Sequence, residues 1–146
     1  MEIMKIFLSG LIATSVMTAF SYILAEIRDK QFREPELLNM LLSRSDLFRL
    51  KLSKNSIAGW ILHYLIGWMF VILFEVIWSL EIFSFSTLIS GVILGFIAGI
   101  IGIFSWKFMF WISKNPPKIT WSEYYIQLII AHILFGISAA IFYELW

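Results

Sequence analysis

The sequence contains no cysteine, and only two of its 146 residues are histidine. The absence of cysteine excludes disulfides, thiol catalysis and zinc sites built from thiolates, and it leaves the compartment undecided. Charged residues make up 14% of the chain and the formal net charge is +1, a balance that argues against a nucleic-acid partner. The chain also carries no phosphate-binding glycine loop and no nucleophile with a plausible base. The motifs therefore indicate no enzyme class, although a membrane enzyme can assemble its site across helices.

Hydrophobic residues are abundant instead, at 60% of the chain. Too few polar residues remain to cover the surface of a soluble domain of this size. A hydrocarbon core of ~30 Å requires about 20 apolar residues per spanning helix, and the chain has four such segments, at about 4–25, 57–78, 86–107 and 121–143. Because only helices satisfy their own backbone in lipid at this length, we predict an all-α, four-helix transmembrane bundle in the lipid bilayer, formed as a single domain by residues 1–146.

The two halves of the chain, 6–78 and 84–146, repeat the same order of rare residues. In each half a histidine is followed by a glycine four positions on and a glutamate twelve positions on. These residues are His63, Gly67 and Glu75 in the first half, and His132, Gly136 and Glu144 in the second. The pattern predicts two tandem two-helix repeats related by an axis along the membrane normal.

Small residues recur every four positions in the first segment of each half. They are Gly10, Thr14 and Thr18, and then Gly91, Gly95 and Gly99. This spacing is typical of faces where membrane helices approach closely. We therefore expect the segments 4–25 and 86–107 to pack near the pseudo-two-fold axis, with a face for self-association as the alternative.

Basic residues predict the orientation in the membrane. Ten of the eleven lysines and arginines follow the first and third apolar segments, and only Lys5 lies on the other side. The positive-inside rule then places both long loops in the cytoplasm and both termini outside.

The first long loop has an amphipathic pattern of its own. Pro35 suits the first turn of a helix, and four leucines follow at the spacing of one helical face, namely Leu37, Leu38, Leu41 and Leu42. A second stretch, 45–52, alternates apolar and basic residues. We predict one or two short amphipathic segments on the inner membrane surface, with a docking surface for a partner as the alternative.

The two histidines carry most of the functional information, because ionisable residues within a span are costly and usually face the bundle interior. Three interpretations remain open. In the first, each histidine forms only a local hydrogen bond. In the second, His63 and His132 face each other and ligate the iron of a b-type haem, with Gly67 and Gly136 making room for the macrocycle. In the third, the pair lines a path for a solute, a quinone or a proton. Two histidines alone are too few for a closed zinc site.

The glutamates of the repeat lie near the predicted outer interface. Glu75 is about 120° around the helix and about 18 Å along it from His63, so the two side chains cannot pair within one helix. We expect Glu75 and Glu144 to form an acidic pair of solvated interfacial carboxylates, with an outward-facing gate for cations as the alternative.

The segment Gly59-Trp60-Ile61-Leu62-His63, with Gly67 after it, resembles small uncharacterised four-span bacterial membrane proteins. The resemblance covers mostly the second apolar segment, implies a bacterial inner-membrane protein and carries no activity with it. From the residues we favour a non-enzymatic membrane subunit that binds a ligand or a partner, either another membrane protein or a second copy. The alternative is a transporter or channel for a small solute, an ion, a quinone or a lipid that uses the same cavity.

Overall fold

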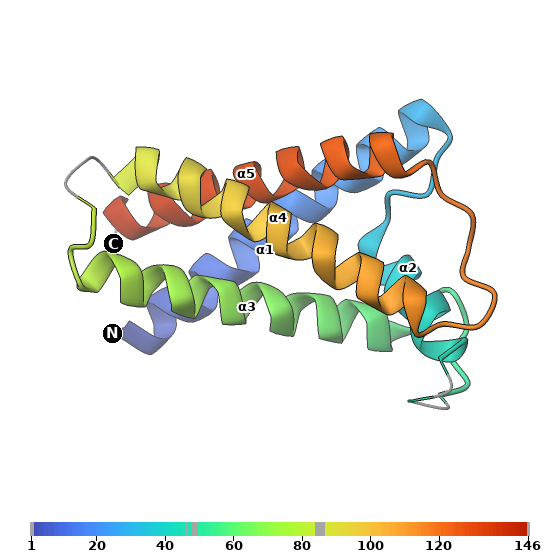
Figure 1. Ribbon diagram of the computed structural model, residues 1–146. Coiled ribbons are helices and arrows are strands. Elements are labelled where there is room, and N and C mark those ends of the chain that lie inside the picture. Colours follow the sequence, from blue (N-terminus) through green and yellow to red (C-terminus); the bar gives the residue numbers. More distant parts are fainter. Residues whose placement is uncertain (1, 46, 48–49, 84–86, 146) are drawn as a thin grey trace.

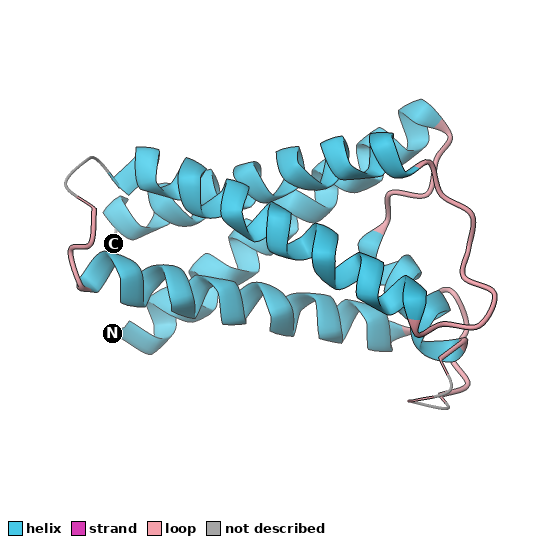
Figure 2. Ribbon diagram, in the orientation of Figure 1, coloured by secondary structure: helices cyan, strands magenta, loops and turns pink. Residues whose placement is uncertain are grey.

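The computed structural model describes residues 2–45, 47, 50–83 and 87–145. This part of the chain forms five helices and no strand (Figure 2). The helices are α1 (Glu2–Arg28), α2 (Glu34–Ser43), α3 (Ile57–Ser79), α4 (Thr87–Trp111) and α5 (Trp121–Leu145). The prediction of an all-α bundle is therefore confirmed.

Four of the helices, α1, α3, α4 and α5, are long and apolar enough to cross a membrane. Their outer faces carry large apolar side chains such as Leu65, Ile97 and Ile126, which are about half exposed or more. A continuous apolar exterior of this kind is unfavourable in water and suits lipid. The chain is thus a multi-pass membrane protein.

The four spans run alternately between two ends of the bundle (Figure 1). The termini end holds both chain ends and the turn after α3, and the loop end holds α2 and the two long connections. The most extensive packing is between α4 and α5, and α1 packs against α5 and α3. By contrast, α3 and α4 meet over only a small area, which leaves that side of the bundle weakly closed.

Both stripes of small residues lie at close helix contacts, but α1 and α4 are not each other's main neighbours. In the described chain, the stripe on α1 contacts α3 and the stripe on α4 contacts α5. The observed neighbours are Trp68 for Gly10, Gly67 for Thr14, His63 for Thr18, Gly136 for Gly91, Ile133 for Gly95 and Ile129 for Gly99. Each stripe therefore joins the two helices of its own predicted repeat, while the duplication itself stays a prediction.

The contact of α4 with the backbone of α5 predicts a large cost for a side chain at Gly95. A Cβ there would lie 2.9 Å from the Cα of Ile133 on α5, a backbone atom that cannot yield without moving the helix. We expect Gly95→Leu to lower the free energy of unfolding in detergent by roughly 1–3 kcal/mol, measured from thermal melts. The control is Ile93→Leu on the exposed face of the same helix. Equal melting temperatures for the two variants would contradict the α4–α5 contact.

Helix α2 does not lie on the membrane surface. Leu37 and Leu41 are fully buried, in a cluster with Trp106 of α4 and with Tyr124 and Leu128 of α5. The leucine face expected to contact lipid is therefore covered by the chain's own spans. The second amphipathic segment does not form a helix in its described residues, 45, 47 and 50–52, and Asp46, Phe48 and Arg49 lie outside the described residues.

Polar contacts fix α2 at both ends and in the middle. At its start, Glu34 accepts hydrogen bonds from Ser21 of α1 and Gln127 of α5. In its middle, Asn39 binds the backbone around the start of α3. Near its end, the hydroxyl of Ser113, just after α4, shares its proton between the carbonyls of Met109, at 2.7 Å, and Leu41, at 3.1 Å. This short helix is thus tied to all four spans.

Candidate functional site

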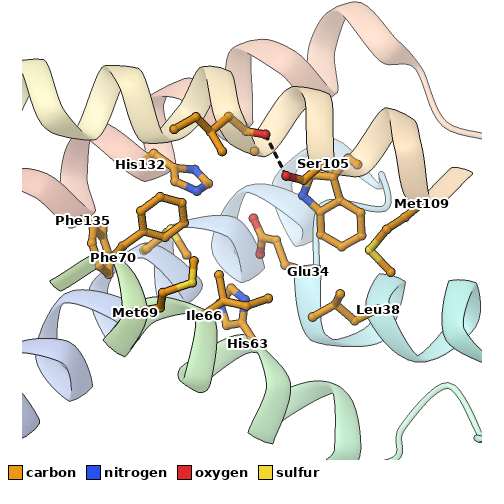
Figure 3. A pocket seen from close by; sticks show the side chains of 15 residues that line it. Glu34, Leu38, His63, Ile66, Met69, Phe70, Ser105, Met109, His132 and Phe135 are labelled. Carbon is orange, nitrogen blue, oxygen red and sulfur yellow. Dashed lines mark hydrogen bonds between the residues drawn. The ribbon is translucent and has the colours of Figure 1, made fainter. Parts of the chain in front are cut away.

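A cavity of about 220 Å³ lies between α3 and α4 at the depth of the two histidines. Its walls are mainly apolar and aromatic, and both His63 and His132 line it (Figure 3). Three residues of its rim, Ile66 and Met69 of α3 and Ile101 of α4, are between 36% and 50% exposed on the outer face. The cavity therefore has a lateral opening, formed by these three residues, on the lipid-facing surface.

His63 is buried on α3 and forms a hydrogen bond with α1. Its Nε2 lies 2.9 Å from the hydroxyl oxygen of Thr18. That hydroxyl donates its single proton to the carbonyl of Thr14, at 2.6 Å. The Thr18 oxygen must therefore accept from His63, so Nε2 carries the proton and Nδ1 is the acceptor nitrogen of the neutral ring.

His132 is buried on α5 and is oriented by its own helix. Its Nδ1 lies 2.8 Å from the carbonyl oxygen of Leu128, and since a carbonyl can only accept, Nδ1 donates. In the neutral ring Nε2 is then the acceptor. The ring edge meets Phe70 of α3 at 6.2 Å between centroids, and Gly102 of α4 lies beside Nε2. Each histidine thus makes the local hydrogen bond of the simplest interpretation, and both still line one cavity.

Glu34, which the sequence analysis did not select, is the third polar group of the cavity wall. It is 2% exposed, and its carboxyl group points between the two histidines (Figure 3). Oε1 accepts hydrogen bonds from Ser21 at 2.7 Å and from Gln127 at 3.0 Å, whereas Oε2 has no hydrogen-bond partner among the described residues. Burial raises the pKa of Glu34 from 4.5 to about 7, and the two hydrogen bonds oppose that rise.

No cation in the described chain is positioned to neutralise Glu34. Among the described lining residues, Glu34 is the one acidic or basic side chain besides the histidines. The guanidinium of its neighbour Arg33 pairs with Glu26 and Glu36 instead. Lys30 of the same connection pairs with Glu123 at the start of α5. The cavity therefore contains one acid that lacks a counter-ion.

A b-type haem does not fit this arrangement. The open side of Gly67 is filled by the side chain of Thr14, and that of Gly136 by the backbone of Gly91, so neither glycine makes room for a macrocycle. The Nε2 of His63 is already engaged by Thr18. Haem ligation by His63 and His132 is therefore not part of the function proposed below.

The predicted acidic pair is not equivalent in the structure. Glu75 is buried, and its Oε2 lies 3.8 Å from the ammonium nitrogen of Lys5, which also stacks 3.6 Å over the ring of Tyr143. Glu144 is exposed. The expectation of a solvated carboxylate is thus wrong for Glu75, because Lys5 crosses to it from α1.

No known family model, curated protein or solved structure matches this chain. The assignment of the candidate site therefore rests on the geometry of the described residues. Of the predicted ligand-binding residues, the structure brings His63, His132 and Gly67 to one cavity. It places Gly136 in the α4–α5 contact instead.

Proposed function

We propose that the protein is a non-enzymatic membrane protein that binds a small lipid-soluble molecule with a polar head in the cavity lined by His63 and His132. One observation carries this proposal. The chain has only two histidines, they lie on different spans, and both line the same apolar cavity. Apolar pockets with a few convergent polar groups are the usual form of small-molecule sites.

The ligand reaches this site from the bilayer. The lateral opening at Ile66, Met69 and Ile101 faces lipid, and α3 and α4 contact each other little. Sites that enclose a whole drug-sized ligand measure about 300–1,000 Å³, and this cavity is smaller, at about 220 Å³. It accommodates a head group whose apolar remainder stays in the lipid.

The orientation and location follow from the sequence pattern. The loop end, which carries most of the basic residues, faces the cytoplasm by the positive-inside rule, and both termini lie outside. The resemblance of the segment around His63 to small four-span bacterial proteins supports a bacterial inner membrane. The cavity then lies nearer the cytoplasmic face, where α2 closes the bundle. Transport of the same ligand and association with a second membrane protein stay predictions.

Photolabelling tests the proposed site. The probe is a trifluoromethyl-phenyldiazirine bearing a benzyl alcohol, a neutral lipid-soluble molecule, added to the protein in liposomes. After illumination and mass spectrometry of peptides, we expect labels on Met17 and Phe70, which are 5% and 8% exposed and line the cavity. Ala139 is at least as buried as these two residues, but it lies away from the cavity, so we expect no label there.

A matched pair of variants separates occupation of the cavity from contact with lipid. Gly102→Leu places a side chain next to His132 inside the cavity, and it should remove most of the label from Met17 and Phe70. Ile100→Leu, on the exposed face of the same helix, should leave the labelling unchanged. Labelling of Met17 no stronger than that of Ala139 in the wild type would overturn the proposal.

A further inference from the structure

We infer that the ligand of this cavity carries a cationic, hydrogen-donating head, such as a primary ammonium group, and that Glu34 binds it. The inference rests on the proposed function, because it names the chemical class of the ligand for the same site. Three independent features of the cavity support it: its hydrogen-bonding capacity, its charge and its aromatic walls.

The hydrogen-bonding groups of the cavity are mostly acceptors. Glu34 offers Oε2, and the proton positions described above leave Nδ1 of His63 and Nε2 of His132 as lone pairs. The hydroxyl of Ser105 is engaged with the carbonyl of Ile101 at 2.9 Å. Apart from the indole N–H of Trp106, and the O–H of Glu34 while that group is protonated, the described wall thus presents no free donor. A ligand with several donors satisfies these groups, and a ligand with only carbonyl acceptors does not.

The charge of the cavity also favours a cationic head group. An ionised carboxylate in an apolar site is costly unless a cation compensates it, and Arg33 is turned away to Glu26 and Glu36. In the empty cavity the proton supplies this compensation, and in the filled cavity the ammonium group replaces it. Because burial places the pKa of Glu34 at about 7, proton and ligand compete for the carboxylate near neutral pH.

The walls suit an organic cation better than a metal ion. Phe70, Phe135 and Trp106 line the cavity, and aromatic faces attract cations, most strongly where water is excluded. The described histidines and acids form no group that could ligate one metal ion together. A polyatomic head group, which can reach each acceptor with a different donor atom, therefore suits the cavity better than a single metal ion.

Two probes that differ in one functional group test this inference. They are the phenyldiazirine benzyl alcohol used above and the corresponding benzylamine, which is protonated at neutral pH. For the wild type we expect half-maximal labelling of Met17 at about tenfold lower concentration of the amine, the size of effect typical of a charge-assisted hydrogen bond. Glu34→Gln should remove this preference while the alcohol still labels the cavity, which shows that the variant is folded.

Glu36→Gln is the matched control, since Glu36 lies on the same helix, pairs with Arg33 and Lys54, and is outside the cavity. It should keep the tenfold preference. Equal labelling by amine and alcohol in the wild type, or a preference that survives Glu34→Gln, would overturn the inference and leave the proposed function standing. Failure of both probes to label Met17 would instead overturn the proposed function.

The pH dependence gives a second readout. Lowering the pH from 8 to 6 protonates Glu34, so the preference for the amine should shrink severalfold, and the alcohol should respond little. The titratable groups that face Glu34 are Tyr22 of α1 and Tyr124 of α5, which lie within electrostatic range, and the two histidines across the cavity. All four remain in Glu34→Gln, so a pH effect that persists in this variant contradicts the role of Glu34.

Discussion

The melting temperature of the wild-type protein in detergent should fall relative to that of Glu34→Gln as the pH rises from 5 to 8. The pKa of Glu34 is 4.5 in the unfolded chain and about 7 in the folded one. Between these values the folded state keeps a proton that the unfolded state has lost, so folding is progressively less favoured as the pH rises. Above about pH 8 the carboxyl group is ionised in both states and the loss is complete. The total change is roughly 3 kcal/mol, from the size of the shift and ~1.4 kcal/mol per pKa unit.

Glu34→Gln is the reference for this comparison because it lacks the titration of Glu34. Glutamine is the neutral isostere of the protonated acid, and its carbonyl oxygen can still accept from Ser21 and Gln127 as Oε1 of Glu34 does. The variant keeps His63 and His132, so the difference between the two melting curves reports Glu34 alone. Glu36→Gln, whose parent side chain is ion-paired, serves as the control. A fall of equal size in Glu34→Gln and in the wild type would show that Glu34 does not carry it.

Asn39→Ala is the second substitution with a large expected effect. The side chain of Asn39 is 1% exposed and joins α2 to the start of α3. Its amide nitrogen donates to the carbonyls of Lys54 and Ser56, at 3.0 and 2.6 Å, and its oxygen accepts from the backbone N–H of Gly59 at 2.8 Å. Alanine loses all three bonds and leaves the buried N–H of Gly59 without this partner. We expect a loss of roughly 3 kcal/mol, at about 1 kcal/mol per bond, measured by thermal or denaturant unfolding in detergent.

Two further variants define what Asn39 contributes. Asn39→Asp keeps the acceptor for Gly59 but turns a buried carboxylate oxygen toward the carbonyls of Lys54 and Ser56, so it should be at least as destabilising as Asn39→Ala. Ser43→Ala, at the end of the same helix, removes only a bond to the carbonyl of Met40 and should cost less than 1 kcal/mol. If Asn39→Ala costs no more than Ser43→Ala, then the connection between α2 and α3 does not stabilise the fold.

The sequence predicts the spans well but not their partners. Length and apolarity are enough to locate a membrane helix, and the four expected segments agree with α1, α3, α4 and α5. Apolar residues surround each span on all sides, because lipid and protein neighbours are equally apolar, so no hydrophobic face indicates the partner. The spacing of Gly91 and Gly95 indicates a close contact without indicating that α5 makes it. The contacts between helices are therefore evident only in the structure.

Only part of the candidate site could be predicted from the sequence, for a related reason. The rarity of His63 and His132 was enough to select them. Glu34 shares a helical face with Leu37, Leu38 and Leu41, at positions i, i+3, i+4 and i+7, and this was the signal for its burial. An acid in a charged loop is ordinarily solvated, however, and only the contacts of α2 with Ser21 and Gln127 show otherwise.

The position of α2 has a consequence for biosynthesis. A ribosome completes α2 well before the segments that hold it, since Ser113 is made 72 residues after Leu41, and Gln127 is made 93 residues after Glu34. Until then the leucines of α2 lack their covering helices, and the nearest apolar medium is the bilayer interface. The nascent helix therefore rests on the membrane surface, where its amphipathic sequence suits it. We expect its contacts with α4 and α5 to form only when these spans have been inserted, so the carboxyl group of Glu34 should lose its water late in assembly.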